Sequence, residues 1–418
     1  MLVVFFGTML AGVPIAFSIG LSSAFYIIFS DISPIVFAQQ LYVGMNSFSL
    51  LAIPLFCLSG DLMNTSGLTK RLVNLAKALV GHWPGSLAQV CVLACAMFGA
   101  LSGSAVAACT CMGTMLIPLM KEEGYDEGYA CAVTAAAALL GPMIPPAISV
   151  VLYGSITNTS IPKLLMAGLA PSIVMIIGFC LTNHITAKRR HYLTHPRMPA
   201  KEKAKALKEA IPALIAPLII MGGILSGVFT ATEAGAVAAV YALIAGFVLK
   251  ELNANSLKKA LVSTTKMTAT IMILNGFANT FSWVLTRENI PTALTQSMLK
   301  LCSTPFSFLL VVIVILLILG CFLTNASITA MIAPLFHPIA LMYGMNPVHF
   351  GTLFHVMTAS GALTPPVGTM LFVSAKVGQT PMSKIIKNLW PFIGIMLLTA
   401  IIIAAFPGFS IFFGNLAK

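Results

Sequence analysis

Two glycine–proline segments with nearly the same pattern stand 220 residues apart in this chain. They are residues 141–146, Gly-Pro-Met-Ile-Pro-Pro, and residues 361–366, Gly-Ala-Leu-Thr-Pro-Pro. A proline has no backbone N–H to donate and its ring clashes with the preceding helical turn, so each double proline interrupts a helix. The backbone carbonyl groups released by such a break are oxygen ligands, which hard cations require. The two segments therefore predict cation sites built from backbone rather than from charged side chains.

Two clusters of small hydroxyl residues extend this pattern. Residues 102–105 read Ser-Gly-Ser-Ala, and residues 324–327 read Thr-Asn-Ala-Ser. Helix N-termini near flexible segments of this kind carry partial positive charge and suit a carboxylate. For a single cluster the alternative is close helix packing through small residues. The duplication of the proline breaks favours a binding site, because matched helix interruptions in two halves are typical of transporters.

The candidate site is drawn from these four segments and one histidine. The candidate cation-binding residues are Ser102, Gly103, Ser104, Gly141, Pro145, Thr324, Asn325, Gly361, Thr364 and Pro365. The candidate substrate-binding residues are Ala105, Pro146, Ala326, Ser327, Pro366 and His355. His355 precedes the second proline break by two helical turns, and its alternative role is packing with a satisfied hydrogen bond.

The other ionisable residues do not form catalytic machinery. Few of them fall in apolar segments, chiefly Asp61, Glu233, His337 and His355. They make no carboxylate pair, histidine cluster or nucleophile with a neighbouring base, which argues against an enzyme. We expect Asp61 to cap or be solvated near a segment end, and Glu233 to begin a helix. The nine cysteines lie in apolar segments and predict packing, with a soft metal at Cys109 and Cys111 as the alternative.

The composition is that of an integral membrane protein. Apolar residues make up 58% of the 418 positions, charged residues only 8%, and the mean hydropathy is +0.98. A soluble domain carries about 25% charged residues. At about 20 residues per membrane span, the apolar content predicts about a dozen helices. We expect residues 2–29 to be a retained span, because no basic residue precedes this apolar run.

Eight of the 23 basic residues lie in one segment, so the net charge of +12 does not indicate nucleic-acid binding. Residues 188–208 hold eight basic side chains, whereas residues 122–127 hold four acidic ones. Basic loops stay on the cytoplasmic side, so the basic segment is predicted to be cytoplasmic and the asymmetry to set the topology. Contact with anionic lipid is the alternative role for the basic residues.

The basic segment also divides the chain into similar halves. We expect a first repeat over residues 1–187, a cytoplasmic linker over 188–208 and a second repeat over 209–418. Each half has a long first span, a small-residue-rich apolar run, a Pro-Pro helix and a closing span. If each half crosses the membrane an odd number of times, the repeats are inverted. Residues 68–82 predict an amphipathic helix, lying either in the membrane interface or in an ordinary loop.

The chain closely resembles the large membrane subunit of tripartite ATP-independent periplasmic transporters over nearly its whole length. The stretches that carry the resemblance in the first half are Leu51–Phe56, Leu62–Leu68, Leu101–Val106, Gly141–Pro146 and Thr232–Ala236. Those in the second half are Gly320–Leu323, Pro347–Gly351 and Leu363–Gly368. Their combination in this order is specific to the family.

The resemblance implies a fold, a mechanism and partners. The fold is all-α, with about 11–12 transmembrane helices in two inverted repeats, two re-entrant hairpins and two Pro-Pro-broken helices. Residues 102–105 and 324–327 would form the hairpin tips, and the Pro-Pro segments would complete Na⁺ sites. The mechanism is elevator-type, Na⁺-coupled uptake of an organic acid anion, such as sialic acid, a sugar acid or a C4-dicarboxylate, across the bacterial inner membrane. The partners are a small four-helix membrane subunit and a periplasmic substrate-binding protein, with membrane lipid around them.

Two departures from the family pattern concern the cation sites. Ala108 and Thr324 stand where family members often carry acidic residues, so the number of coupled Na⁺ ions stays open. We expect no cofactor, no metal other than Na⁺ and no nucleic acid. The alternative function is a free-standing Na⁺–dicarboxylate symporter that needs no binding protein. A membrane-embedded enzyme or channel is disfavoured, because no catalytic group or charged pore ring is visible.

Overall fold

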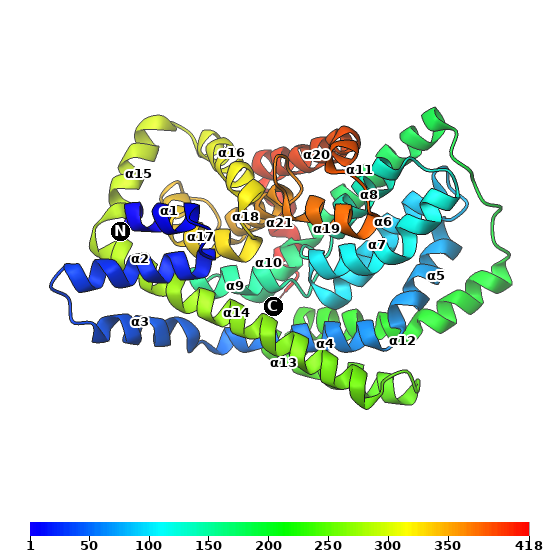
Figure 1. The fold of residues 1–418 in the computed structure, drawn as a ribbon, viewed down its shortest axis with the longest axis horizontal. Coiled ribbons are helices and arrows are strands. Elements are labelled where there is room, and N and C mark those ends of the chain that lie inside the picture. The colour runs from blue at the N-terminus through cyan, green and yellow to red at the C-terminus, as the bar shows by residue number, and fades with distance from the viewer. Residues whose placement is uncertain (418) are drawn as a thin grey trace.

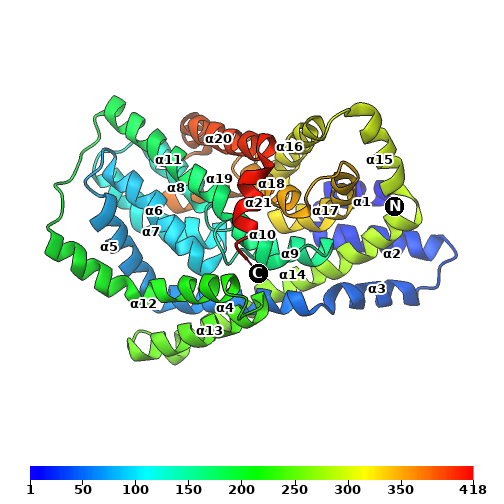
Figure 2. The ribbon, with the colours of Figure 1, turned by 180° about the vertical axis from the view of Figure 1, so that it is seen from behind.

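The computed structural model describes residues 1–417, with all of their side chains except those of Leu2 and Leu10. Helices account for all of the regular structure within this range. They form two groups, which we call the frame and the bundle. In both views the frame helices α3, α4, α13 and α14 run along one long edge, and the bundle helices α11, α16 and α20 lie toward the other (Figures 1 and 2).

The frame is built from the beginning of each half of the chain. Its elements are α1 (Leu2–Leu10), α2 (Ile15–Phe29), α3 (Ile35–Met45), the short 3-10 helix η1 (Phe48–Leu51), α4 (Ala52–Thr65), α5 (Leu68–Val80), α12 (Ala200–Leu225), α13 (Ala231–Val248), α14 (Ala254–Arg287) and α15 (Ile290–Leu301). The long helix α14 packs against α2, α3 and α4 and so joins the two halves.

The bundle is built from the remainder of each half. Its elements are α6 (Ser86–Ser102), α7 (Ala105–Glu122), α8 (Glu127–Ala138), α9 (Ile148–Thr157), α10 (Ile161–Ala167), α11 (Leu169–Arg190), α16 (Pro305–Phe322), α17 (Asn325–Met342), α18 (Pro347–Gly361), α19 (Thr369–Gly378), α20 (Met382–Ala405) and α21 (Pro407–Gly414). Alanine-rich α8 is buried from Gly128 to Ala138, so the bundle packs around it.

The all-α membrane fold is confirmed, with fewer long helices than expected. Eight described helical segments are long and apolar enough to cross a membrane. They are Phe48–Thr65, Ala105–Glu122, Ile161–Arg190, Ala200–Leu225, Ala231–Val248, Pro305–Phe322, Asn325–Met342 and Met382–Ala405. The sequence predicts 11–12 helices because it includes apolar segments that the structure divides into shorter helices.

The first apolar run is one of these divided segments. Residues 2–29 form α1 and α2 rather than the single expected span, with residues 11–14 between them. Gly12 has φ +86°, and Pro14 directly precedes α2. Because proline lacks an N–H and clashes with the preceding turn, a continuous helix through Pro14 would lose a hydrogen bond.

The amphipathic segment forms a helix that packs on protein. It is α5, whose Leu68 and Leu72 are fully buried against the neighbouring helices α6 and α12. Its apolar face is therefore covered by the chain itself, and only Leu79 at its end is largely exposed. The structure therefore favours an ordinary connecting helix over a helix that lies in the membrane interface.

The basic segment is a loop only over residues 191–199. Its first basic residues form the last turn of α11, and residues 200–208 begin α12. The acidic segment lies beside it, since Glu123 Oε1 is 2.9 Å from His195 Nε2. Burial, with Lys203 and Arg197 nearby, lowers the pKa of His82 on this side of the molecule. The lowered pKa favours the neutral form of His82, so this ring adds little charge to the basic segment.

Helix caps identify where several frame helices begin. Thr230 forms a capping box with Glu233 at the start of α13, which confirms that Glu233 begins a helix.

Asp61, however, lies inside α4 and not at a segment end. Its Oδ2 accepts a hydrogen bond of 3.1 Å from Thr264 Oγ1 on α14, so it joins two frame helices.

Candidate functional site

Two helical hairpins and two broken helices bring the candidate residues together. Hairpin 1 is α6 and α7, which meet at a tip formed by Gly103 and Ser104. Hairpin 2 is α16 and α17, which meet at a tip formed by Leu323 and Thr324. The first break is residues 139–147, between α8 and α9, and the second is residues 362–368, between α18 and α19. Each break contains its double proline.

The tip of hairpin 1 packs directly against the first break. A Cβ atom placed on Gly99 would lie 2.6 Å from Gly141 Cα, so α6 and the first break touch backbone to backbone. Gly103 has φ +59°, and a Cβ there would overlap the carbonyl oxygen of Pro146. Only glycine fits this position, because of both its conformation and the close approach of the break.

The tip of hairpin 2 packs against the second break in the same way. Gly320 and Gly361 lie so close that a Cβ on either would overlap the Cα of the other. The Gly368 N–H donates a 2.9 Å hydrogen bond to the carbonyl oxygen of Cys321. Cys321 Sγ is 3.4 Å from the carbonyl oxygen of Pro365. The hairpin end and the break therefore form one backbone-rich cluster in each half.

Hydroxyl side chains at the tips cap the helices that follow. Ser104 Oγ accepts a 3.3 Å hydrogen bond from the Ala107 N–H at the start of α7. Thr324 Oγ1 accepts a 3.3 Å hydrogen bond from the Ser327 N–H at the start of α17. Capping fixes where each helix begins and leaves its earlier N–H groups, including that of Ala326, without intrahelical partners.

The two halves interlock through the helices that follow the breaks. Helix α9 of the first half packs against α17, and Tyr153 Oη is 2.8 Å from His337 Nδ1. Helix α19 of the second half packs against α7, where the Lys121 ammonium donates a 2.7 Å hydrogen bond to the Gly378 carbonyl oxygen. Each broken helix thus contacts a hairpin of its own half before the break and the hairpin of the other half after it.

His355 connects the two halves at the breaks themselves. Its side chain is buried on α18, and its Nε2 is 2.7 Å from the carbonyl oxygen of Pro142 in the first break. The ring therefore occupies a satisfied packing position. This geometry favours the packing role over direct contact with a substrate.

The hairpins enter the bundle from opposite ends. Asp126, at the base of hairpin 1, has Oδ1 3.7 Å from Arg190 Nη1 at the C-terminal end of α11. Asn346, at the base of hairpin 2, lines a cavity together with Lys163, which precedes α11. Because α11 has 22 residues, its ends lie about 33 Å apart. The tips therefore approach the middle of the bundle from two sides.

Apart from His355, the predicted residues form two groups, and each group comes from one half of the chain. The group at hairpin 1 and the first break contains Ser102, Gly103, Ser104, Ala105, Gly141, Pro145 and Pro146. The group at hairpin 2 and the second break contains Thr324, Asn325, Ala326, Ser327, Gly361, Thr364, Pro365 and Pro366. The first break is almost entirely buried, whereas Pro366 in the second is exposed.

Oxygen atoms dominate the chemistry that these groups offer. Asn325 Oδ1 is buried and has no hydrogen-bond partner in the described chain. Buried polar atoms normally have partners, so an unpaired oxygen beside a break is a candidate cation ligand. Among the described residues, no three His, Cys, Asp or Glu side chains gather to hold a metal, which leaves Cys109 and Cys111 without a further ligand of this kind.

The sequence interpretation missed the glycines that allow these contacts and the surfaces where the bundle meets the frame. Gly99 and Gly320 stand 221 residues apart, so the repeat itself was a usable signal for them. No such signal marked Gly60 on α4, where a Cβ would lie 2.8 Å from Ser102 Cα. Nor did one mark Ser47, whose Oγ is 3.2 Å from Ser155 Oγ across the frame–bundle boundary.

Comparison with known proteins identifies relatives along almost the whole chain. Residues 2–409 match the family described as "Tripartite ATP-independent periplasmic transporter, DctM component". The chain is 36% identical to the sialic acid TRAP transporter large permease protein SiaM of Vibrio cholerae, over 97% of this chain and 95% of that protein. It is 37% identical to the C4-dicarboxylate TRAP transporter large permease protein DctM of the same species, over 97% and 94%.

A longer relative and a distant fold relative complete the comparison. The isethionate TRAP transporter permease protein DctMQ of Oleidesulfovibrio alaskensis is 36% identical over 97% of this chain and 65% of its own length. The crystal structure of the Alcanivorax borkumensis YdaH transporter has a TM-score of 0.65, covering 88% of this chain and 87% of that chain. At 14% sequence identity, this last similarity concerns the fold alone.

Proposed function

This chain belongs to the DctM component family of tripartite ATP-independent periplasmic transporters, and from that premise we propose that it drives uptake of an organic acid anion with Na⁺. As a member of this family it is the large permease of a membrane transporter and not an enzyme. The observation that carries the proposal is the pair of hairpin–break contacts, Gly99 with Gly141 and Gly320 with Gly361. They duplicate one backbone-rich arrangement in a bundle whose hairpins enter from opposite ends.

Na⁺ would bind to oxygen atoms at the hairpin tips and breaks. Neither group contains a carboxylate, so carbonyl and hydroxyl oxygens would have to supply the ligands. The candidate cation residues are those expected from the sequence, from Ser102, Gly103, Ser104, Gly141 and Pro145 in one group to Thr324, Asn325, Gly361, Thr364 and Pro365 in the other. The unpaired Asn325 Oδ1 supports this assignment for the second group.

The organic anion would bind where the two hairpin tips face each other. The N-terminal ends of α7 and α17 begin at these tips, and unpaired helix N–H groups attract carboxylates. We propose that Ala105, Pro146, Ala326, Ser327 and Pro366 contact the anion, and that His355 positions the first break through Pro142. Relatives named for sialic acid and C4-dicarboxylates support an anion of this class, including sugar acids.

Alternating access would require the bundle to move against the frame. The contacts between the two groups include small residues, such as Gly60 against Ser102, and hydroxyl contacts, such as that of Ser47 with Ser155. A polar cavity of about 300 Å³ also lies on this boundary, lined in part by Asn275 and Asn279. Small and uncharged contacts of this kind favour an elevator-type movement of the bundle.

The family also supports two protein partners in the bacterial inner membrane and periplasm. We propose that a small four-helix membrane subunit binds this chain and that a periplasmic binding protein delivers the anion. Proteoliposomes containing this chain and the small subunit should accumulate labelled sialic acid, sugar acid or C4-dicarboxylate only when the binding protein is added. Equal uptake without the binding protein would support the alternative, a free-standing Na⁺–dicarboxylate symporter.

A further inference from the structure

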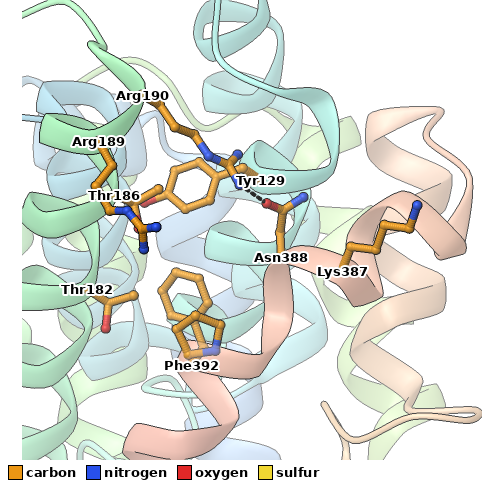
Figure 3. A pocket seen from close by; sticks show the side chains of 9 residues that line it. Tyr129, Thr182, Thr186, Arg189, Arg190, Lys387, Asn388 and Phe392 are labelled. Atoms are coloured by element: carbon orange, nitrogen blue, oxygen red, sulfur yellow. Dashed lines mark hydrogen bonds between the residues drawn. The ribbon is translucent and has the colours of Figure 1, made fainter.

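A basic pocket lies at the linker end of the bundle, away from the hairpin tips. It has a volume of about 350 Å³ and lies between the C-terminal end of α11 and the N-terminal half of α20, with α8 as a third wall. Figure 3 shows Arg189 and Arg190 from α11 on one side and Lys387 and Asn388 from α20 on the other. The transport mechanism proposed above uses none of these side chains.

The positive charge of this pocket is only partly compensated. Arg190 Nη2 donates a 2.7 Å hydrogen bond to Asn388 Oδ1, and its guanidinium lies 5.4 Å from the centre of the Tyr129 ring. The same guanidinium is 3.7 Å from Asp126. Arg189 and Lys387 have no hydrogen-bond or ion-pair partner in the described chain, and no acidic side chain lines the pocket. Two positive charges therefore face the pocket without a counterion.

Basic residues in a last helical turn also interact favourably with the helix dipole, which is the simpler explanation for Arg189 and Arg190. That explanation does not extend to Lys387, which lies near the beginning of α20. Lys387 is the sixth residue of α20, beyond the first turn where the helix dipole acts, yet it lines the same pocket as the two arginines. The convergence of charges from two helices points to an anion between them.

The surroundings of the pocket identify the kind of anion. Along α11, directly next to the pocket, Ile185, Leu181 and Ile177 are 49%, 55% and 62% exposed. Trp390 on α20 is 60% exposed, and tryptophan is enriched at the level of lipid headgroups. The pocket therefore lies where a basic helix end meets an apolar, lipid-facing surface.

We propose that this pocket binds the phosphate of an anionic phospholipid, with the acyl chains lying along the apolar face of α11. The phosphodiester would bridge Arg189 and Lys387, while Asn388 and Tyr129 hold Arg190 in place. A lipid bound in this way would fasten the ends of α11 and α20 together at the membrane surface. The proposal does not depend on which anion is transported.

The test compares lipid binding to the full chain and to two charge-matched double variants. In R189Q/K387Q, both altered side chains are exposed and unpaired, so folding should not change. In K205Q/K208Q, the same charge is removed from exposed positions on α12, away from the pocket. The purified protein, with its small subunit, is titrated with phosphatidylglycerol, phosphatidylcholine or inorganic phosphate and followed by native mass spectrometry and thermal unfolding.

The wild-type protein should bind phosphatidylglycerol in preference to phosphatidylcholine. R189Q/K387Q should bind phosphatidylglycerol about 30-fold more weakly, whereas K205Q/K208Q should bind it normally. Unchanged binding by R189Q/K387Q, or an equal loss in K205Q/K208Q, would overturn the site. If inorganic phosphate stabilises the wild-type protein as well as phosphatidylglycerol does, the pocket takes a free anion and the lipid assignment is wrong.

Discussion

Gly320 on α16 and Gly361 at the end of α18 lie backbone to backbone, with no room for a side chain on either residue. The relationship matters because it sets how closely hairpin 2 approaches the second break. In the other half, Gly99 and Gly141 make the same contact with the first break. The small residues therefore do more than pack helices, since they hold each hairpin tip against the carbonyl groups that its break exposes.

Substitution of these glycines should lower the free energy of unfolding, and by more where the backbones lie closer. We expect Gly320→Ala to destabilise the protein by about 1–3 kcal/mol and to lower transport severely, because the methyl group must push the hairpin from the break. Thermal unfolding and uptake measurements check this. Gly394→Ala is the matched control on α20, where nothing lies within 4 Å of the added Cβ. A Gly320→Ala protein with normal unfolding and normal uptake would show that the close contact is dispensable.

The proline breaks should be required for transport more than for folding. Replacing both Pro365 and Pro366 by Ala favours helix by about 3 kcal/mol per residue and withdraws carbonyl oxygens from the proposed cation site. We expect a folded protein with severely reduced uptake and, where uptake remains, a lower apparent affinity for Na⁺. Pro217→Ala on α12 controls for removing a proline from a helix outside the breaks.

The corresponding change at Pro145 and Pro146 should reduce both uptake and stability. These prolines are buried, and the carbonyl oxygen of Pro146 lies against Gly103. Thermal unfolding in detergent separates the two effects. A well-folded double variant at either break that transports at the normal rate would assign the prolines to packing alone.

The sequence predicted those parts of the site that depend on residues close together in the chain. The proline breaks could be located, because proline geometry and the 220-residue repeat are visible in the sequence. Residues 102–105 and 324–327 could be located as clusters of small residues, whereas only the family resemblance predicts that they form hairpin tips. The packing of α9 against α17, and of α19 against α7, could not be derived, since it depends on how distant helices meet.

Similar limits explain the individual corrections. Asp61 follows an apolar run and therefore predicts a segment end, because the sequence does not reveal its contact with Thr264, 203 residues away. Hydropathy predicts one span over residues 2–29 because it does not detect the helix interruption at residues 11–14. The sequence allows both a substrate-binding and a packing role for His355, and the contact of its ring with Pro142 favours packing.

The opposite entry of the hairpins predicts opposite membrane exposure of their bases. Glu122 is the last residue of α7 and Met342 the last of α17, and both are exposed. Single cysteines at these positions should react with an impermeant thiol reagent from opposite sides, Glu122→Cys from the side of the basic segment. Right-side-out and inverted vesicles distinguish the two, with the unsubstituted protein as the control for native cysteines. Labelling from the same side would contradict inverted repeats.

A cross-link between frame and bundle should arrest transport. Ser47 Oγ and Ser155 Oγ are 3.2 Å apart, so cysteines at both positions are close enough for a disulfide after small adjustment. Oxidised Ser47→Cys/Ser155→Cys protein should lose uptake, and reduction should restore it. The single variants should transport in both conditions. Full uptake by the fully cross-linked protein would rule out movement of α9 against η1.

The most direct test of the account measures uptake in proteoliposomes that contain this chain, the small subunit and the binding protein. If the oxygen clusters at the two tips and breaks bind Na⁺, an inward Na⁺ gradient should drive accumulation of the organic acid. Replacing external Na⁺ by K⁺ should abolish that accumulation, and Asn325→Ala should raise the Na⁺ concentration needed for half-maximal uptake. Full accumulation driven by a proton gradient in the absence of Na⁺ would contradict the cation assignment.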